Sequence, residues 1–178
     1  MTEQNKNDTF NACAHLVESE EAIQQFLEEH KDVDTLSLIL DKQLELQKFM
    51  EKRDDWYLPH FDPKEEKTVG EMMRLLQFSK SNFDKEYFEL EDAMGGMSNG
   101  AKEASAVNKP WKKDHVKYIS KMYKDLSDDD VSEIKMEVVD MFHFFAMIMV
   151  TLGMTSEEVK YLYTRKNLEN FDRQNRGY

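Results

Sequence analysis

The chain has 178 residues, of which 40% are hydrophobic and 34% are charged, with only 6 Gly and 3 Pro. This composition excludes collagen-like and low-complexity proteins, and its apolar content is too high for a disordered acidic tail. The formal net charge is −12, which excludes a surface that attracts nucleic acid over its whole area, so we expect no nucleic-acid partner.

The chain carries no sign of secretion or membrane insertion. Its single cysteine, Cys13, excludes an internal disulfide bond. No apolar stretch reaches the roughly 20 residues that a membrane-spanning helix needs. The first residues lack the basic and then apolar pattern of a signal peptide. We therefore expect no membrane contact and a cytoplasmic location.

The first half of the chain is predicted to be helical. A helix over residues 10–29 forms an N-terminal extension (residues 1–30), and apolar residues near a period of 3.6 predict another after Asp34, over residues 36–50. Thr68 and Glu71 have capping-box spacing, so a long helix is expected from Val69 to the glycine pair at residues 95–96.

The second half continues with helices and one loop. Small and polar residues predict a loop over residues 95–110, followed by a short basic helix over residues 111–124. Ser127 caps the next helix, which ends before Gly153, and Thr155 opens a last helix to about residue 171. Residues 172–178 are expected to form a mobile tail. Together these elements predict one domain, residues 1–178, with the all-α architecture of a helical bundle.

One predicted helical segment, residues 141–150, is apolar on every side. Such a helix is usually buried on every side. Two copies of the chain can bury each other's apolar faces, so we expect a homodimer.

Two acidic pairs carry the predicted chemistry. Glu86 and Glu89 lie three residues apart, and Glu137 and Asp140 repeat this spacing on another helix. At about 100° per residue, each pair lies on one helix face. Both pairs border apolar residues, and close carboxylates repel by about 4 kcal/mol per pair at an effective dielectric constant near 20. A divalent cation removes this cost, and oxygen ligands favour Mg²⁺ first and Mn²⁺ second.

Cationic residues suited to phosphate follow further along the chain. Lys166, Asn170 and Arg173 share one face of the last predicted helix. Residues 109–124 hold six lysines and one aspartate; among these we select Lys109 and Lys112, which flank Trp111, as substrate contacts. Carboxylates for a metal together with cations for phosphate indicate an enzyme that acts on a nucleotide polyphosphate.

These motifs resemble those of the all-α NTP pyrophosphatases, in particular the dimeric dUTPase group and the dCTP pyrophosphatase/dUTPase enzymes of T-even-type bacteriophages. The motifs are Glu86-x-x-Glu89, Glu137-x-x-Asp140 leading into Met141-Phe142-His143-Phe144-Phe145, Lys166-x-x-x-Asn170-x-x-Arg173-Gln174 and Arg176-Gly177-Tyr178. Further similar segments are residues 10–16, 102–107, 109–112 and 133–178.

The resemblance implies hydrolysis of dCTP and dUTP, and of their diphosphates, by attack of water on the α-phosphorus. It implies that the two acidic pairs hold Mg²⁺ and that Glu89 activates the water. It implies phosphate contacts from Lys166, Asn170 and Arg173, closure of the site by Arg176 and Tyr178, and pyrimidine recognition by Gln43 and Gln47. It also implies a role in phage nucleotide pools in the host cytoplasm, in association with other nucleotide-synthesis enzymes.

The chain departs from the phage pattern at Asn108, where the relatives have an aromatic residue, and at Pro110. Base preference is therefore expected to differ if this position contacts the base. Two alternative functions stay open: a di-iron carboxylate bundle, which requires Glu-x-x-His motifs that this chain lacks, and a non-catalytic acidic binding protein. Asp140 and His143 have the spacing closest to such a motif.

Overall fold

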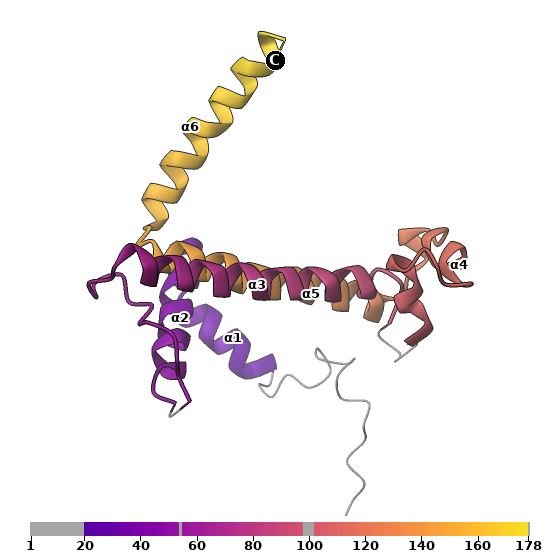
Figure 1. Ribbon diagram of the computed structural model, residues 1–178, viewed down its shortest axis with the longest axis horizontal. Helices are drawn as coiled ribbons and strands as arrows, with labels where there is room; N and C mark the ends of the chain where they lie inside the picture. The colour runs from indigo at the N-terminus through magenta and orange to yellow at the C-terminus, as the bar shows by residue number, and fades with distance from the viewer. Residues whose placement is uncertain (1–19, 54, 98–101, 178) are drawn as a thin grey trace, which may run out of the picture. The chain divides into compact units, whose positions relative to one another are not determined.

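The computed structural model describes residues 20–53, 55–97 and 102–177 (Figure 1). Every regular element in these ranges is helical, which confirms the all-α prediction. The α-helices are α1 (Glu20–Glu29), α2 (Thr35–Met50), α3 (Val69–Ala93), α4 (His115–Ile119), α5 (Asp128–Thr151) and α6 (Ser156–Asn175). Two short 3₁₀ helices, η2 (Lys102–Asn108) and η3 (Tyr123–Asp125), lie between α3 and α5.

The contacts within the chain define two compact units. The first contains Met1–Glu29 and Lys80–Phe144, and the second contains His30–Ser79 and Phe145–Tyr178. Each unit is described by itself below, and the organisation as one domain stays a prediction.

The long helices begin where their capping residues predict. At the start of α3, the Thr68 amide donates to Glu71 Oε2 (2.8 Å), and the Glu71 amide donates to Thr68 Oγ1 (3.2 Å). Thr155 and Glu158 form the same capping box at the start of α6. Gly153 follows the end of α5 with a φ of 68°, a left-handed conformation that glycine adopts without strain.

Three predicted segments differ from the structure. Residues 102–108 form η2 where a loop was expected, and the helix predicted over residues 111–124 is reduced to α4 and η3. Helix α6 continues to Asn175, so residues 172–175 are helical. Of the helix predicted over residues 10–29, residues 20–29 form α1 and residues 10–19 lie outside the described part of the chain.

The core of the second unit joins α2 to the end of α5. Leu40 of α2 packs with Ala146, Met149 and Val150. The first turns of α2 and α6 are linked by a 2.7 Å hydrogen bond between the hydroxyl groups of Ser37 and Ser156.

The core of the first unit lies beyond the end of α3. Met97, Ala104, Ala106 and Tyr118 are buried there in one cluster. Lys121 Nζ lies 4.8 Å from the centre of the Tyr118 ring and donates a 2.6 Å hydrogen bond to the carbonyl oxygen at residue 95. These contacts fasten η2 and α4 to the residues that follow α3.

The apolar segment of α5 is only partly buried. Ala146, Met147, Met149 and Val150 are buried, whereas the side chains of Phe142 and Phe145 are 37% and 48% exposed. The single chain therefore leaves the two aromatic rings partly exposed, and burial of residues 141–150 on every side by a second copy stays a prediction. Within the described residues, no single helix is long and apolar enough to span a membrane, although α5 and α6 together, bent by 103°, meet those criteria.

Candidate active site

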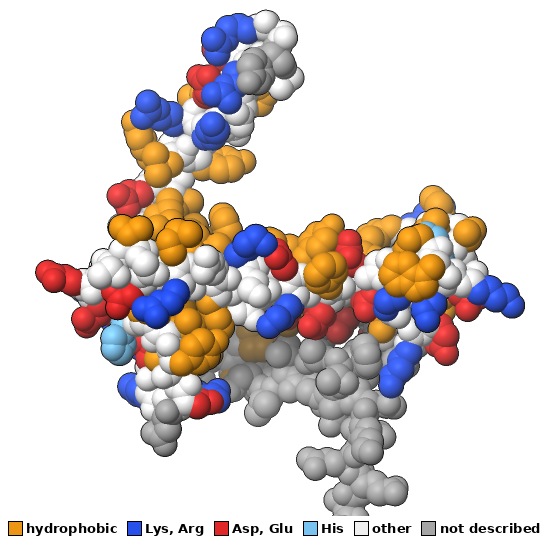
Figure 2. Space-filling model, viewed as in Figure 1, with side chains coloured by type: hydrophobic (Ala, Val, Ile, Leu, Met, Phe, Trp, Pro, Cys, Tyr) orange, Lys and Arg blue, Asp and Glu red, His pale blue; other side chains and the backbone are white. Residues whose placement is uncertain are grey.

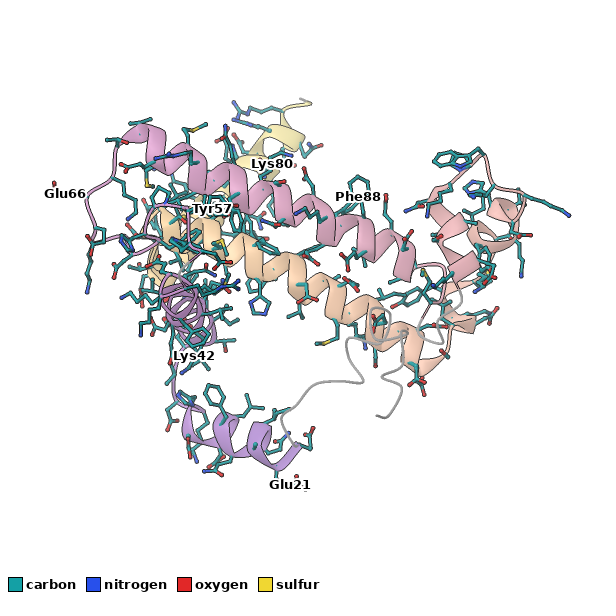
Figure 3. All side chains as sticks on the ribbon, turned by 60° about the horizontal axis from the view of Figure 1, so that its bottom comes forward. Glu21, Lys42, Tyr57, Glu66, Lys80 and Phe88 are labelled. Carbon is teal, nitrogen blue, oxygen red and sulfur yellow. The ribbon has the colours of Figure 1, made fainter. Side chains whose placement is uncertain are left out.

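Helices α3 and α5 run side by side and bring three carboxylates of the first unit together (Figures 1 and 3). One oxygen each from Glu86, Glu89 and Glu137 can be chosen so that all three lie within 4.8 Å of one another. Glu137 is buried, Glu86 is half-buried and Glu89 is exposed. The cluster therefore contains one buried carboxylate, one half-buried carboxylate and one carboxylate that faces solvent.

Two of the three carboxylates, Glu86 and Glu137, have raised pKa values. Burial raises the pKa of Glu137 to about 7, and the negative charges of Glu89, Asp140, Glu133 and Glu86 contribute to the rise. Burial also raises the pKa of Glu86, with further repulsion from Glu89 and Asp140. A cation among these oxygens would reverse the repulsion, and three carboxylates at this separation are suitable ligands for a hard divalent ion.

Asp140, the fourth predicted ligand, lies near the cluster but outside the group of three. It acts on the cluster through its charge, since it raises the pKa of both Glu86 and Glu137. Burial raises the pKa of Asp140 itself, and His143, one turn further along α5, opposes this rise. The geometry thus brings three of the four predicted ligands together, with Asp140 within electrostatic range.

Residues 108–112 are anchored to α3 beyond the cluster. Asn108 Nδ2 donates a 2.9 Å hydrogen bond to Asp92 Oδ1, and Lys109 Nζ lies 4.0 Å from the same oxygen. Trp111 is 75% exposed, and Lys112 is also exposed. Of the predicted substrate contacts in this segment, Lys109 is held beside α3, whereas Trp111 and Lys112 are open to solvent.

The two glutamines predicted to read the base lie on α2 in the second unit. Gln43 and Gln47 are 3% and 1% exposed, one helical turn apart. Gln47 Oε1 is buried, and no hydrogen-bond donor among the described residues reaches it. A buried amide oxygen without a donor is costly, which singles out Gln47 as a residue that a ligand could satisfy.

The predicted phosphate-binding residues lie on α6, also in the second unit. Lys166 and Asn170 are exposed. Arg173 pairs with Glu169 at 3.0 Å, and Arg176 pairs with Asp172 at 2.8 Å. Tyr178 lies outside the described residues. The position of these residues relative to the carboxylate cluster stays a prediction.

Two proteins of known name match this chain over nearly its full length. The dCTP pyrophosphatase of Enterobacteria phage LZ5 is 43% identical over 171 residues, which cover 95% of this chain and 98% of that protein. The dCTP pyrophosphatase of Enterobacteria phage T4 is 40% identical over 175 residues, with the same two coverages. The chain belongs to the T-even phage dCTP pyrophosphatase family.

The family assignment confirms the resemblance predicted from the motifs. A DNA replication protein of phage T4 is also 39% identical over 164 residues, which are 89% of this chain but 40% of that protein. No family model matches the chain, and no solved structure matches it.

The motifs missed two acidic residues that lie near the carboxylate cluster on α3 and α5. Glu133 is 8% exposed, lies one turn before Glu137 on α5 and raises the pKa of Glu137. Asp92 lies one turn after Glu89 and binds Asn108. The spacing of three or four residues from a predicted ligand is the signal in the sequence that could have identified both.

Proposed function

We propose that the protein is a nucleotide pyrophosphohydrolase that converts dCTP and dUTP into the monophosphates and pyrophosphate. The corresponding diphosphates would yield phosphate. The observation that carries this proposal is the meeting of Glu86, Glu89 and Glu137 in a chain 40–43% identical to two phage dCTP pyrophosphatases. We propose Mg²⁺ as the cofactor, with Mn²⁺ as a substitute.

The donor set fits a divalent cation. Glu86, Glu89 and Glu137 offer oxygens within 4.8 Å of one another. The charge of Asp140 raises the pKa of Glu86 and of Glu137, and we propose Asp140 as a fourth ligand. When bound, such a cation neutralises the carboxylates, lowers the pKa of water and polarises phosphate oxygens. The raised pKa of Glu137 supports this role, because it is the behaviour of a carboxylate that lacks a positive partner.

In the proposed reaction, Glu89 orients the attacking water and accepts its proton. Glu89 is the exposed member of the cluster, so substrate and water can approach it from solvent. The water oxygen attacks the α-phosphorus in line with the bond to the leaving group. Lys166 and Arg173 would stabilise the charge on the departing pyrophosphate or phosphate. Attack at the α-phosphorus accounts for the use of both di- and triphosphates, since only the leaving group differs.

Further phosphate contacts are proposed from Asn170 on α6, from Arg176, which follows this helix, and from Tyr178. In this structure the half-buried Arg173 pairs with Glu169, and the exposed Arg176 pairs with the exposed Asp172. Exposed ion pairs contribute little stability, so a phosphate can replace these carboxylates at small cost. Lys109, Trp111 and Lys112 are proposed to contact the nucleotide from the first unit.

Base recognition is proposed for Gln43 and Gln47. An amide offers both a donor and an acceptor, and it can turn to suit either pyrimidine. The buried Gln47 Oε1, for which the described part of the chain offers no donor, supports this role, because a base donor would satisfy it.

We also propose a homodimer. Helix α6 exposes Tyr161, Tyr163, Leu168 and Phe171, each at least 65% exposed, and Figure 2 shows hydrophobic side chains on this helix. Exposed apolar side chains of this kind are typical of an interface between subunits. We propose that the partly exposed rings of α5 supply further contacts. Light scattering coupled to gel filtration tests this proposal, which a monomeric mass would contradict.

The proposed biological role is control of pyrimidine deoxynucleotide pools during phage DNA synthesis in the host cytoplasm. Removal of dCTP would keep unmodified cytosine out of phage DNA. The match to part of a T4 protein named for DNA replication supports a role close to DNA synthesis. Association with other nucleotide-synthesis enzymes is proposed on the same ground.

The test is hydrolysis of dCTP and dUTP with Mg²⁺, with EDTA, and by the variant Glu89→Gln. We expect pyrophosphate release with Mg²⁺, none with EDTA, and loss of turnover in Glu89→Gln with an unchanged circular dichroism spectrum. Glu91→Gln, a change on the same helix outside the cluster, is the matched control and should remain active. In ¹⁸O-water the label should enter the monophosphate; label in pyrophosphate would refute attack at the α-phosphorus.

A further inference from the structure

The side-chain amide of Asn108 is held in one orientation. Its Nδ2 donates to Asp92 Oδ1 at 2.9 Å. An ionised carboxylate only accepts hydrogen bonds, so the NH₂ group must face Asp92 and the amide oxygen must face the other way. Asp92 therefore decides which polar group Asn108 presents away from α3.

The oxygen presented in this way has no partner among the residues that the structure describes. Asn108 Oδ1 is buried, and no donor among the described residues lies within hydrogen-bond distance of it. A buried acceptor left without a donor costs about 1–3 kcal/mol, and most buried polar groups in proteins are paired. The residue as a whole is half-buried, so the amide lies near the surface, where a ligand can reach it once covering side chains move aside.

The amide lies close to the carboxylate cluster. Asp92 follows Glu89 by three residues on α3, an advance of about 4.5 Å along the helix axis. Lys109, adjacent to Asn108, lies 4.0 Å from Asp92, and Trp111 exposes its ring in the same segment. In a nucleotide whose α-phosphate lies at the cluster, the base lies several ångströms away, a separation that allows it to reach a group one turn beyond Glu89.

We infer that Asn108 Oδ1 accepts a hydrogen bond from the exocyclic amine of cytosine and thereby makes dCTP the preferred substrate. Cytosine carries an N4 donor where uracil carries an O4 acceptor. An acceptor fixed at this position is satisfied by cytosine and faces a second acceptor in uracil, which disfavours dUTP. Asp92 is the positioning residue in this arrangement. The inference rests on the proposed function and assigns a base preference to the same site.

The experiment measures kcat/KM for dCTP and for dUTP in the full-length protein and three variants. Asn108→Leu removes the acceptor, so the ratio of dCTP to dUTP should fall by about 10-fold or more, mostly through dCTP. In Asp92→Asn the new amide can either donate a hydrogen bond to Asn108 or accept one from it. The Asn108 side-chain amide is then free to rotate by 180°. The ratio should again move towards one, although Asn108 itself is unchanged. Ser105→Ala is the control in η2, where the hydroxyl donates to the Lys102 carbonyl oxygen, and it should keep the parent ratio.

Each outcome decides the inference. A parent enzyme without preference for dCTP, or an equal loss of both activities in Asn108→Leu, would show that Asn108 only holds the segment to α3, and would overturn the proposal. Selective loss of dUTP hydrolysis would mean that Oδ1 receives the uracil N3–H, which overturns it as well. If Asn108→Leu does not fold, the ratio in Asp92→Asn decides. A parent that cleaves neither nucleotide refutes the proposed function, and the base preference with it, whereas active enzymes with an unchanged ratio refute the base preference alone.

Discussion

Replacement of Glu137 by glutamine should stabilise the protein when no divalent cation is present. Glu137 is the buried member of the carboxylate cluster, and its pKa is raised from 4.5 to about 7 by burial and by neighbouring negative charges. In the unfolded chain this carboxylate ionises near pH 4.5, which is a lower pH than in the folded protein. Between pH 4.5 and about 7 the unfolded state therefore binds fewer protons, and the free energy of unfolding falls as the pH rises.

The size of the effect follows from the raised pKa. A rise from 4.5 to about 7 corresponds to about 3 kcal/mol, at about 1.4 kcal/mol per pKa unit. Glutamine keeps the shape but carries no charge, so at pH 8 Glu137→Gln should recover most of this free energy. For a chain of this length, about 3 kcal/mol raises Tm by roughly 6–12 °C.

Thermal unfolding followed by circular dichroism, in EDTA at pH 5 and pH 8, measures this difference. The variant should have the higher Tm at pH 8, and the difference should shrink at pH 5. Excess Mg²⁺ should raise the Tm of the parent more than that of the variant, since the variant has lost a charged ligand. Glu66→Gln, at an exposed position, serves as the control and should change little. A variant no more stable than the parent at pH 8 without metal would show that the carboxylates do not strain the fold.

Two further changes test the contacts that define the helices. Gly95→Ala should lower the free energy of unfolding, measured in urea, by about 1–3 kcal/mol or more, because the new Cβ would lie 2.3 Å from the carbonyl oxygen of Ala104. The control Gly70→Ala should be neutral or stabilising, since its Cβ would have no neighbour closer than 3.9 Å among the described residues. An equal loss of stability in both variants would contradict this reasoning. Thr155→Ala should cost about 1 kcal/mol in the same measurement through loss of the α6 cap, whereas the mid-helix change Thr164→Ala should cost little, and a stable Thr155→Ala would show that the cap is dispensable.

The sequence predicts the long helices well because their signals are local. A cap such as Thr68 with Glu71 acts within one turn, and α3 begins at the residue that this pair indicates. The basic helix predicted over residues 111–124 is shorter in the structure because contacts with distant residues bury only part of it. Tyr118 packs on Met97 and η2, whereas most other residues of the segment stay exposed. Helix α6 continues past its apolar pattern to Asn175, and Arg176, which follows it, pairs with Asp172 one turn earlier.

The candidate site was predictable in its residue types but not in its full membership. The spacing of Glu86 and Glu89 places them on one face of α3 from sequence alone. The contact between Asp92 and Asn108 joins residues 16 positions apart through a turn whose path no local pattern specifies. Tertiary structure decides which side chain Asn108 contacts. For that reason the sequence identifies Asn108 as a departure from the phage pattern but does not indicate its partner.

The exposed lysines near Trp111 belong to a protein of net charge −12, and a nucleoside triphosphate is itself strongly anionic. At low ionic strength the whole molecule repels its proposed substrate over a long range. At physiological ionic strength the Debye length is about 8 Å, so an approaching nucleotide senses mainly the nearest side chains. Moderate salt would then speed the encounter instead of slowing it, the reverse of what is usual for enzymes that attract anions with a basic surface.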